Sequence, residues 1–78
     1  MAALYADGFE KALIGVGYQF NTELAVYDWE KCVEILIERD QMTYEDAVEF
    51  MDFNVTGAWV GKSTPVFVVK TNDQDSVR

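Results

Sequence analysis

The hydrophobic pattern of the chain begins with a β-rich segment at residues 12–20, Ala-Leu-Ile-Gly-Val-Gly-Tyr-Gln-Phe. Branched and aromatic residues dominate this segment, and its two glycines disfavour a helix interior. Asn21, Thr22 and Glu23 have the chemistry of a turn, and the apolar segment 24–27 follows them. The pattern therefore predicts a hairpin of two antiparallel strands, with a bulge at Gly15 and Gly17.

Two amphipathic helices are predicted after the hairpin. Asp28 stands at the N-cap position of the first, and apolar residues recur at helical spacing from residue 29 to residue 39. Thr43 and Asp46 have the spacing of a capping box for the second, with Asp in place of the usual Glu or Gln. The apolar positions of this second helix continue to Asn54 and could extend to Trp59, so its end is left open.

A last strand is predicted at residues 65–69, entered through a proline. The order of elements is strand, strand, helix, helix, strand. We expect one α+β domain over residues 1–70, in which an antiparallel sheet packs on the helical hairpin, and a polar, flexible tail at residues 71–78. Phe50, Trp59 and Phe67 are expected in the core.

Chain length and cysteine content indicate the size of the core and the cellular compartment. A chain of 78 residues has room for one small core, which self-association would enlarge. Cys32 is the sole cysteine, which fits a reducing compartment. Residues 1–7 lack the pattern of a secretory signal, and no apolar run approaches the length of a membrane helix. The sequence predicts a cytoplasmic protein.

The residues that most enzymes need are missing from the composition. The chain has no histidine, which removes the commonest general base, the commonest transition-metal ligand and every His-dependent triad. Residues 57–63 imitate a phosphate-binding loop, but three residues separate their glycines where that motif needs four. We expect no catalytic residue, no metal and no cofactor, and an inert, buried Cys32.

The acidic residues carry the main functional hypothesis. The net charge is −8, and residues 28–52 hold nine acidic side chains against Lys31 and Arg39. This charge opposes direct contact with nucleic acid or anionic membranes and favours a basic partner. Helical spacing predicts two adjacent acidic faces, whose contact set is Glu34, Glu38, Glu45, Glu49 and Asp52. The alternative is that these faces only keep the protein soluble.

The aromatic residues offer a second surface. The chain has eleven aromatic side chains, more than so small a core needs. Some are expected to form a homo-oligomer interface, and the alternative is that all belong to the core. The candidates are Tyr5, Phe9, Tyr18, Tyr27, Trp29, Tyr44, Phe50, Phe53, Trp59 and Phe67.

Several segments together resemble a family of small uncharacterised proteins encoded by bacteriophages. They are Ala-Leu-Ile-Gly-Val-Gly at 12–17, Ala-Val-Tyr-Asp at 25–28, Lys-Cys-Val-Glu-Ile-Leu at 31–36, Met-Thr-Tyr-Glu-Asp-Ala-Val-Glu-Phe at 42–50, and Phe-Asn-Val-Thr-Gly-Ala-Trp-Val-Gly with Thr-Pro-Val-Phe within 53–67. The resemblance covers roughly residues 9–68 and implies a viral accessory protein working inside a bacterial cell. It implies no activity, cofactor or catalytic residue.

Three functional hypotheses follow. The first is an accessory protein that binds a host or phage protein through its acidic helix pair, with nucleic-acid mimicry as one form of that binding. The second is a homo-oligomeric structural or assembly module. The third is a small-molecule binder or an enzyme of unfamiliar type. Increasing salt should weaken the first kind of complex and spare apolar self-association.

Overall fold

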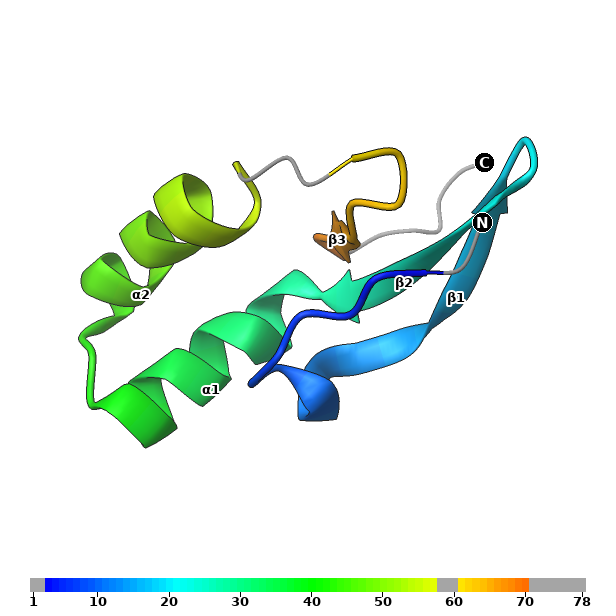
Figure 1. Cartoon of the computed structure of the whole chain (residues 1–78). Helices are drawn as coiled ribbons and strands as arrows, with labels where there is room; N and C mark the ends of the chain where they lie inside the picture. The colour runs from blue at the N-terminus through cyan, green and yellow to red at the C-terminus, as the bar shows by residue number, and fades with distance from the viewer. Residues whose placement is uncertain (1–2, 58–60, 71–78) are drawn as a thin grey trace, which may run out of the picture.

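The predicted class and element order are confirmed by the computed structural model, which describes residues 3–57 and 61–70 (Figure 1). Trp59 and the tail at residues 71–78 lie outside the described residues. The elements in chain order are the 3-10 turn η1 (Glu10–Ala12), the strands β1 (Leu13–Gln19) and β2 (Thr22–Asp28), the helices α1 (Trp29–Asp40) and α2 (Tyr44–Phe50), the π-helical turn η2 (Met51–Val55) and the strand β3 (Val66–Val68).

The hairpin of β1 and β2 has a bulge beside Gly15, as predicted, but none at Gly17, which pairs in regular register with Leu24. The strands pair antiparallel from Gln19 opposite Thr22 to Leu13 opposite Tyr27, around a two-residue turn at positions 20 and 21. The register shifts between Leu13 and Gly15, so β1 holds one residue more than its partner there. The hairpin extends away from the two helices, and β1 lies at one edge of the sheet (Figure 1).

The expectation of an entirely antiparallel sheet is wrong, because β3 runs parallel to β2. Val66, Phe67 and Val68 lie opposite Val26, Tyr27 and Asp28, and the sheet has the order β1-β2-β3. A parallel neighbour requires a crossover of a dozen residues or more. The segment between β2 and β3 includes both helices and provides that crossover. β3 then begins opposite Val26 and runs in the same direction as β2.

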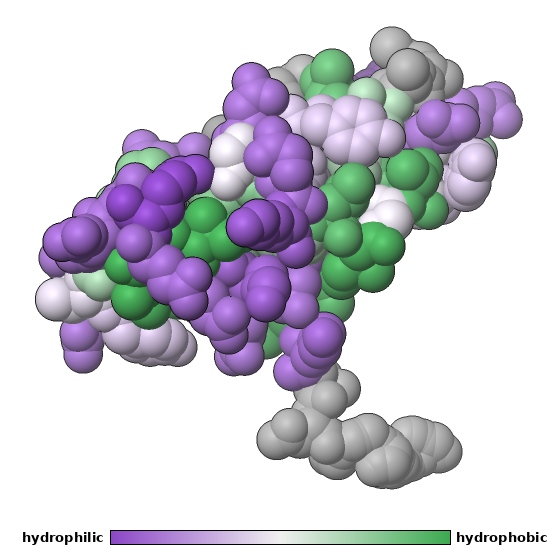
Figure 2. All heavy atoms as spheres, turned by 90° about the horizontal axis from the view of Figure 1, so that it is seen from below, coloured by the Kyte–Doolittle hydropathy of each residue, from purple (hydrophilic) through white to green (hydrophobic). Residues whose placement is uncertain are grey.

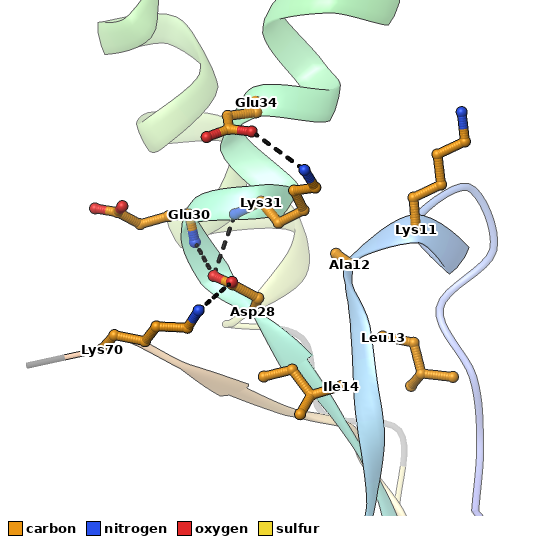
Figure 3. Close-up of a pocket in the computed structure, with 9 residues that line it drawn as sticks. All are labelled: Lys11, Ala12, Leu13, Ile14, Asp28, Glu30, Lys31, Glu34 and Lys70. Carbon is orange, nitrogen blue, oxygen red and sulfur yellow. Dashed lines mark hydrogen bonds and ion pairs between the residues drawn. The ribbon is translucent and has the colours of Figure 1, made fainter.

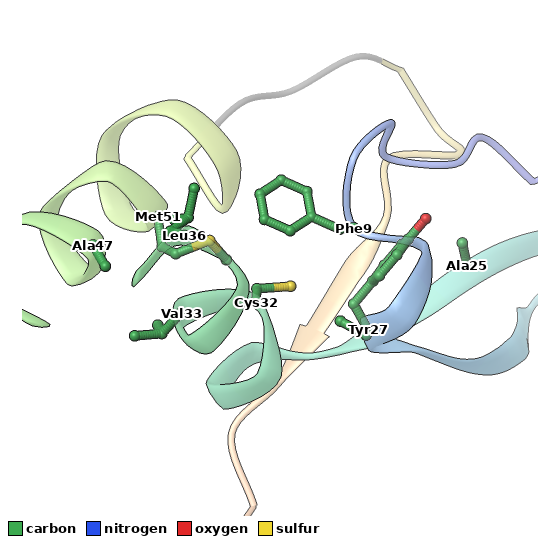
Figure 4. Packing of buried hydrophobic residues seen from close by; sticks show 9 residues of the cluster. Phe9, Ala25, Tyr27, Cys32, Val33, Leu36, Ala47 and Met51 are labelled. Atoms are coloured by element: carbon green, nitrogen blue, oxygen red, sulfur yellow. The ribbon is translucent and has the colours of Figure 1, made fainter. Parts of the chain in front are cut away.

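The core joins the middle strand to the two helices (Figure 4). Tyr27 lies at its centre: the residue is 1% exposed, and its ring stacks on Phe67 with 5.4 Å between the ring centroids. The Tyr27 hydroxyl accepts a hydrogen bond of 2.7 Å from the Ala6 N–H. Phe50 and Phe67 pack against this cluster as partly buried residues, which confirms two of the three expected core aromatics. The buried members are Phe9, Ala12, Ala25, Tyr27, Cys32, Val33, Leu36, Ala47 and Met51.

Both helices begin at the predicted caps. The Asp28 carboxylate accepts from the backbone N–H groups of Glu30 and Lys31, at 3.1 and 3.3 Å. The Thr43 hydroxyl accepts from the N–H of Asp46 at 3.1 Å. These bonds satisfy donors that have no partner inside the first helical turn. The caps therefore fix where each helix begins, and the buried residues of each helix determine which face is turned to solvent.

Candidate partner-binding surfaces

The predicted acidic residues lie on the solvent side of the two helices. The α1 helix buries Cys32, Val33 and Leu36, and the α2 helix buries Ala47. Hydrophilic side chains gather over the helical end of the molecule in Figure 2. The five predicted contact residues are all exposed, and we call them the acidic helix face: Glu34, Glu38, Glu45, Glu49 and Asp52.

The two basic residues between positions 28 and 52 are both engaged by other groups. The Lys31 ammonium lies 3.7 Å from the Glu34 carboxylate. The Arg39 guanidinium donates to the Gly8 carbonyl at 2.9 Å, and its carbon lies 5.6 Å from the centroid of the Phe9 ring. Arg39 also donates to Asp40, and this hydrogen bond holds the pKa of the Asp40 carboxyl below its ordinary value. Arg39 is thus directed at the N-terminal segment.

The consequence is an uneven distribution of charge within the acidic helix face. Among the described residues, no ion pair involves Glu38, Glu45, Glu49 or Asp52. Glu34 differs from them, because Lys31 lies beside it. Helical spacing predicted five equivalent contact residues. In the structure they are not equivalent, because Glu34 has a basic neighbour and the other four carboxylates form no ion pair within the described residues. Four of the five carboxylates therefore have no basic side chain paired with them among the described residues.

Glu34 also borders a groove at the start of α1 (Figure 3). The groove has a volume of about 350 Å³, and Lys70 forms an ion pair of 3.1 Å with Asp28 in it. Burial by itself raises the pKa of Asp28, but the hydrogen bonds from Lys70 and from the N–H groups of Lys31 and Glu30 leave it lowered. Three lysines and three carboxylates line the groove: Lys11, Lys31, Lys70, Asp28, Glu30 and Glu34. Its charges balance, so it does not extend the acidic helix face.

A second surface lies on the hairpin, where apolar side chains are exposed along β1. Tyr18 is 76% exposed, and Phe20 at the turn is 95% exposed. Ile14 and Val16 are also exposed. Phe20 has a φ of 57°, in the left-handed region that bulky residues rarely adopt. We call Ile14, Val16, Tyr18 and Phe20 the β1 edge.

The aromatic candidates divide between the core and the surface. Phe9 and Tyr27 are buried, and Trp29, Phe50 and Phe67 pack partly buried against the core. Tyr5, Tyr18, Tyr44 and Phe53 are exposed. Phe20 was missed among the surface candidates, although it is the most exposed of the large hydrophobic side chains in the described part. Its place beside Asn21 and Thr22, at the end of a strand, is the sequence signal that could have identified it.

An apolar cavity of about 340 Å³ gives the small-molecule hypothesis a location. It lies between the N-terminal segment, the end of α2 and β3, and its walls include Leu4, Phe9, Phe50, Val55 and Phe67. This volume is at the lower end of the range for ligand pockets. Within residues 3–57 and 61–70, no group of three or more metal-ligating side chains comes together.

Cys32 is fully buried, and burial followed by the nearby Asp28 charge raises the pKa of its thiol to about 11. A thiol with this pKa is protonated at neutral pH and is a poor nucleophile. The prediction of a buried cysteine is therefore confirmed, and its raised pKa agrees with the predicted low reactivity. No helix in the described ranges has both the length and the apolar character that crossing a bilayer requires.

The fold and these two surfaces define a small α+β domain with a three-stranded mixed sheet. Comparisons with protein-family models, with curated proteins and with solved structures find no match to this chain. The resemblance to bacteriophage proteins therefore stays a prediction.

Proposed function

We propose that this protein is a binding domain of the phage accessory type, acting in the cytoplasm of a bacterial cell, and that its acidic helix face takes a basic surface of a host or phage protein. The observation that carries the proposal is the engagement of Arg39 by the Gly8 carbonyl and the Phe9 ring, away from this face. Lys31 pairs with Glu34, at one end of the set, and neutralises that carboxylate alone. Glu38, Glu45, Glu49 and Asp52 remain for an outside cation.

Helix geometry suits such a partner. Residues four apart on a helix share a face and lie about 6 Å apart along its axis. Glu45 and Glu49 on one helix, with Glu34 and Glu38 on the other, therefore present regularly spaced carboxylates on rigid elements. A protein surface that binds the phosphates of nucleic acid also favours a regular row of anions. Mimicry of nucleic acid is the form of binding that we favour.

Charge reversal tests the proposal. Glu45→Lys combined with Glu49→Lys changes the net charge from −8 to −4. The matched control, Asp7→Lys with Glu23→Lys, makes the same change outside the two helices. Tagged versions of the three proteins would be used to capture partners from a bacterial lysate at low salt, and the bound proteins would be quantified by mass spectrometry after a salt wash.

The proposal predicts a basic partner that the wild type and the control retain and that the helix variant loses. Replacing two attractive contacts by repulsive ones should weaken binding roughly five-fold or more. Duplex DNA added to the lysate should compete with the wild type for the same partner. Equal retention by all three proteins, with native circular dichroism spectra, would contradict a role for the acidic helix face.

A further inference from the structure

The β1 edge carries two features that are unfavourable in an isolated copy of the chain, a strained residue and exposed aromatic rings. A phenylalanine at positive φ strains the backbone, and L-residues in this region cost about 1–2 kcal/mol. Phe20 gains no burial in return, since 95% of it is exposed. Tyr18 next to it is 76% exposed. A second surface that covers these rings would offset both costs by burying apolar area.

The backbone of β1 is open to a further strand. In an antiparallel pair, alternate residues direct their N–H and C=O groups toward the neighbouring strand and away from it. Gln19 and Thr22 flank the two-residue turn and form a hydrogen-bonded pair, so the N–H and C=O groups of Gln19 point toward β2. Because the direction alternates along the strand, the N–H and C=O groups of Tyr18 and Val16 point away from β2, toward the open side of the sheet. Natural edge strands are protected by lysine, proline, bulges or very short length. The seven-residue β1 contains neither lysine nor proline, and its bulge lies between Leu13 and Gly15, so the regular pairing from Gly15 to Gln19 remains open on the outer side.

We propose that a second copy of this chain pairs with the β1 edge, antiparallel and with Gly17 on the two-fold axis. In this register Val16 lies opposite Tyr18 of the second copy, and Tyr18 lies opposite its Val16. The outward N–H and C=O groups of these residues then bond reciprocally. Phe20 reaches Ile14 of the second copy, so all four exposed apolar residues find an apolar partner. The two sheets join into one six-stranded sheet.

Charge favours a second copy over a charged partner at this surface. Residues 12–22 form the longest stretch of the chain without a charged side chain. Two copies that each carry a net charge of −8 repel one another, and this repulsion is smallest where no like charges meet. Figure 2 shows hydrophobic side chains gathered beyond the hydrophilic helical end of the molecule. Pairing through β1 keeps the acidic helix faces out of the contact.

The exposed area matches a substantial part of what a stable dimer requires. A buried aromatic side chain covers about 150–250 Å². Scaled by their exposures, Phe20 and Tyr18 together offer ~250–430 Å² per copy. A standard interface buries ~800 Å² on each partner, so these two rings supply about a third to a half of it. Val16, Ile14 and the paired backbone add to this area.

Sedimentation equilibrium of purified full-length protein tests the dimer. The wild type should sediment at twice its monomer mass of 8.9 kDa. Tyr18→Lys places a charge at the contact and should weaken the dimer about tenfold or more. Tyr44→Lys is the matched control, because Tyr44 is an exposed tyrosine on α2 and should leave the dimer intact. Added salt should strengthen the wild-type dimer, since it screens the repulsion between two acidic chains.

Cysteine crosslinking tests the register. Gly17 faces Gly17 of the second copy at a Cα separation of about 4.5 Å, which suits a disulfide. Gly17→Cys should therefore form a covalent dimer under mild oxidation; its added carbon approaches a Val26 methyl at 3.3 Å, which a small shift relieves. Gly15→Cys, whose added carbon meets nothing within 4 Å, is the control. Its two thiols would lie roughly 14 Å apart and should not crosslink.

Three results would overturn the proposal. A wild type that stays monomeric up to high micromolar concentration leaves the β1 edge without a second copy. Equal dissociation by Tyr18→Lys and Tyr44→Lys, with native circular dichroism spectra, places the contact elsewhere. Crosslinking of Gly15→Cys in preference to Gly17→Cys excludes the register. Cys32 does not interfere with this assay, because it is fully buried.

Discussion

Replacing Tyr27 with phenylalanine removes one hydroxyl group from the centre of the fold. Tyr27 lies on the middle strand, opposite Leu13 of β1 and Phe67 of β3. Its ring stacks on Phe67, and the hydroxyl accepts from the Ala6 N–H at 2.7 Å, which holds the N-terminal segment against the sheet. Phenylalanine keeps the ring stack, so the substitution isolates the hydrogen bond.

The expected loss of stability follows from the backbone group left behind. Without the hydroxyl, the partly buried N–H of Ala6 loses the acceptor that Tyr27 provides. An unsatisfied buried donor costs about 1–3 kcal/mol. A domain of this length has a total stability of about 4–12 kcal/mol, at ~0.05–0.15 kcal/mol per residue. Tyr27→Phe should therefore lower the melting temperature by about 4–24 °C, at about 4–8 °C per kcal/mol.

Thermal unfolding monitored by circular dichroism checks this value. Tyr44→Phe is the matched control, because the exposed Tyr44 should lose its hydroxyl without a change in melting temperature. Amide hydrogen exchange of Ala6 should also become faster in the Tyr27 variant, which links the loss to that bond. A melting temperature equal to that of the wild type would refute the reasoning, since it would mean that the hydroxyl contributes nothing to folding.

The ionisation of Tyr27 gives the same experiment a second readout. Burial raises the pKa of its phenol, although the hydrogen bond from Ala6 acts in the opposite direction. Because the folded state favours the protonated phenol, its contribution is fully present below the unfolded pKa of about 10 and is lost as the pH rises through the folded value. The wild type should lose stability above about pH 10 more steeply than Tyr27→Phe.

Two further predictions concern the first turns of α1. Asp28→Ala removes the acceptor for two helix N–H groups and the partner of Lys70, and should lower the free energy of unfolding in urea by about 0.5–2 kcal/mol; an unchanged urea midpoint would contradict this. The pKa of Cys32 is raised from 9.0 to about 11 in the folded protein, so folding favours the protonated thiol. The free energy of unfolding should therefore fall by ~3 kcal/mol in total as the pH rises from about 9 to about 11. Cys32→Ala should remove this part of the pH dependence, and an identical pH profile would contradict a buried, protonated thiol.

Much of the fold could be predicted because the signals are local. Asp28 and Thr43 cap the two helices through bonds to residues two or three positions away, so the sequence itself contains both partners. The bulge in β1 falls beside Gly15, where a missing side chain tolerates the irregular backbone. Each of these features depends on a few neighbouring residues and on no distant contact.

The direction of β3 could not be predicted in the same way. It depends on a pairing between segments 40 positions apart in the sequence, since Val66 lies opposite Val26. The residues from Met51 to Val55 continue α2 as a π-helical turn, a change of hydrogen-bonding pattern that helical periodicity does not reveal. A strand of three residues carries too few positions to indicate its own direction.

In the candidate surfaces too, features set by local sequence could be predicted and features set by distant contacts could not. The exposure of Glu45 and Glu49 follows from helical spacing. The engagement of Arg39 does not, because its acceptor, Gly8, is 31 positions away and lies in a segment without regular structure. Phe20 was missed because its exposure comes from the turn conformation, with a positive φ, and composition alone does not show this.

The two proposed surfaces respond to salt with opposite sign, and this makes them separable in one protein. Binding of a basic partner to the acidic helix face weakens as salt rises, because screening reduces the attraction. Pairing through the β1 edge strengthens, because screening reduces the repulsion between copies that each carry −8. A dimer also carries two acidic helix faces, so a partner with two basic sites would bind bivalently and dissociate more slowly than from Tyr18→Lys. The salt dependence of partner binding, measured for the wild type and for Tyr18→Lys, therefore reports on both surfaces at once.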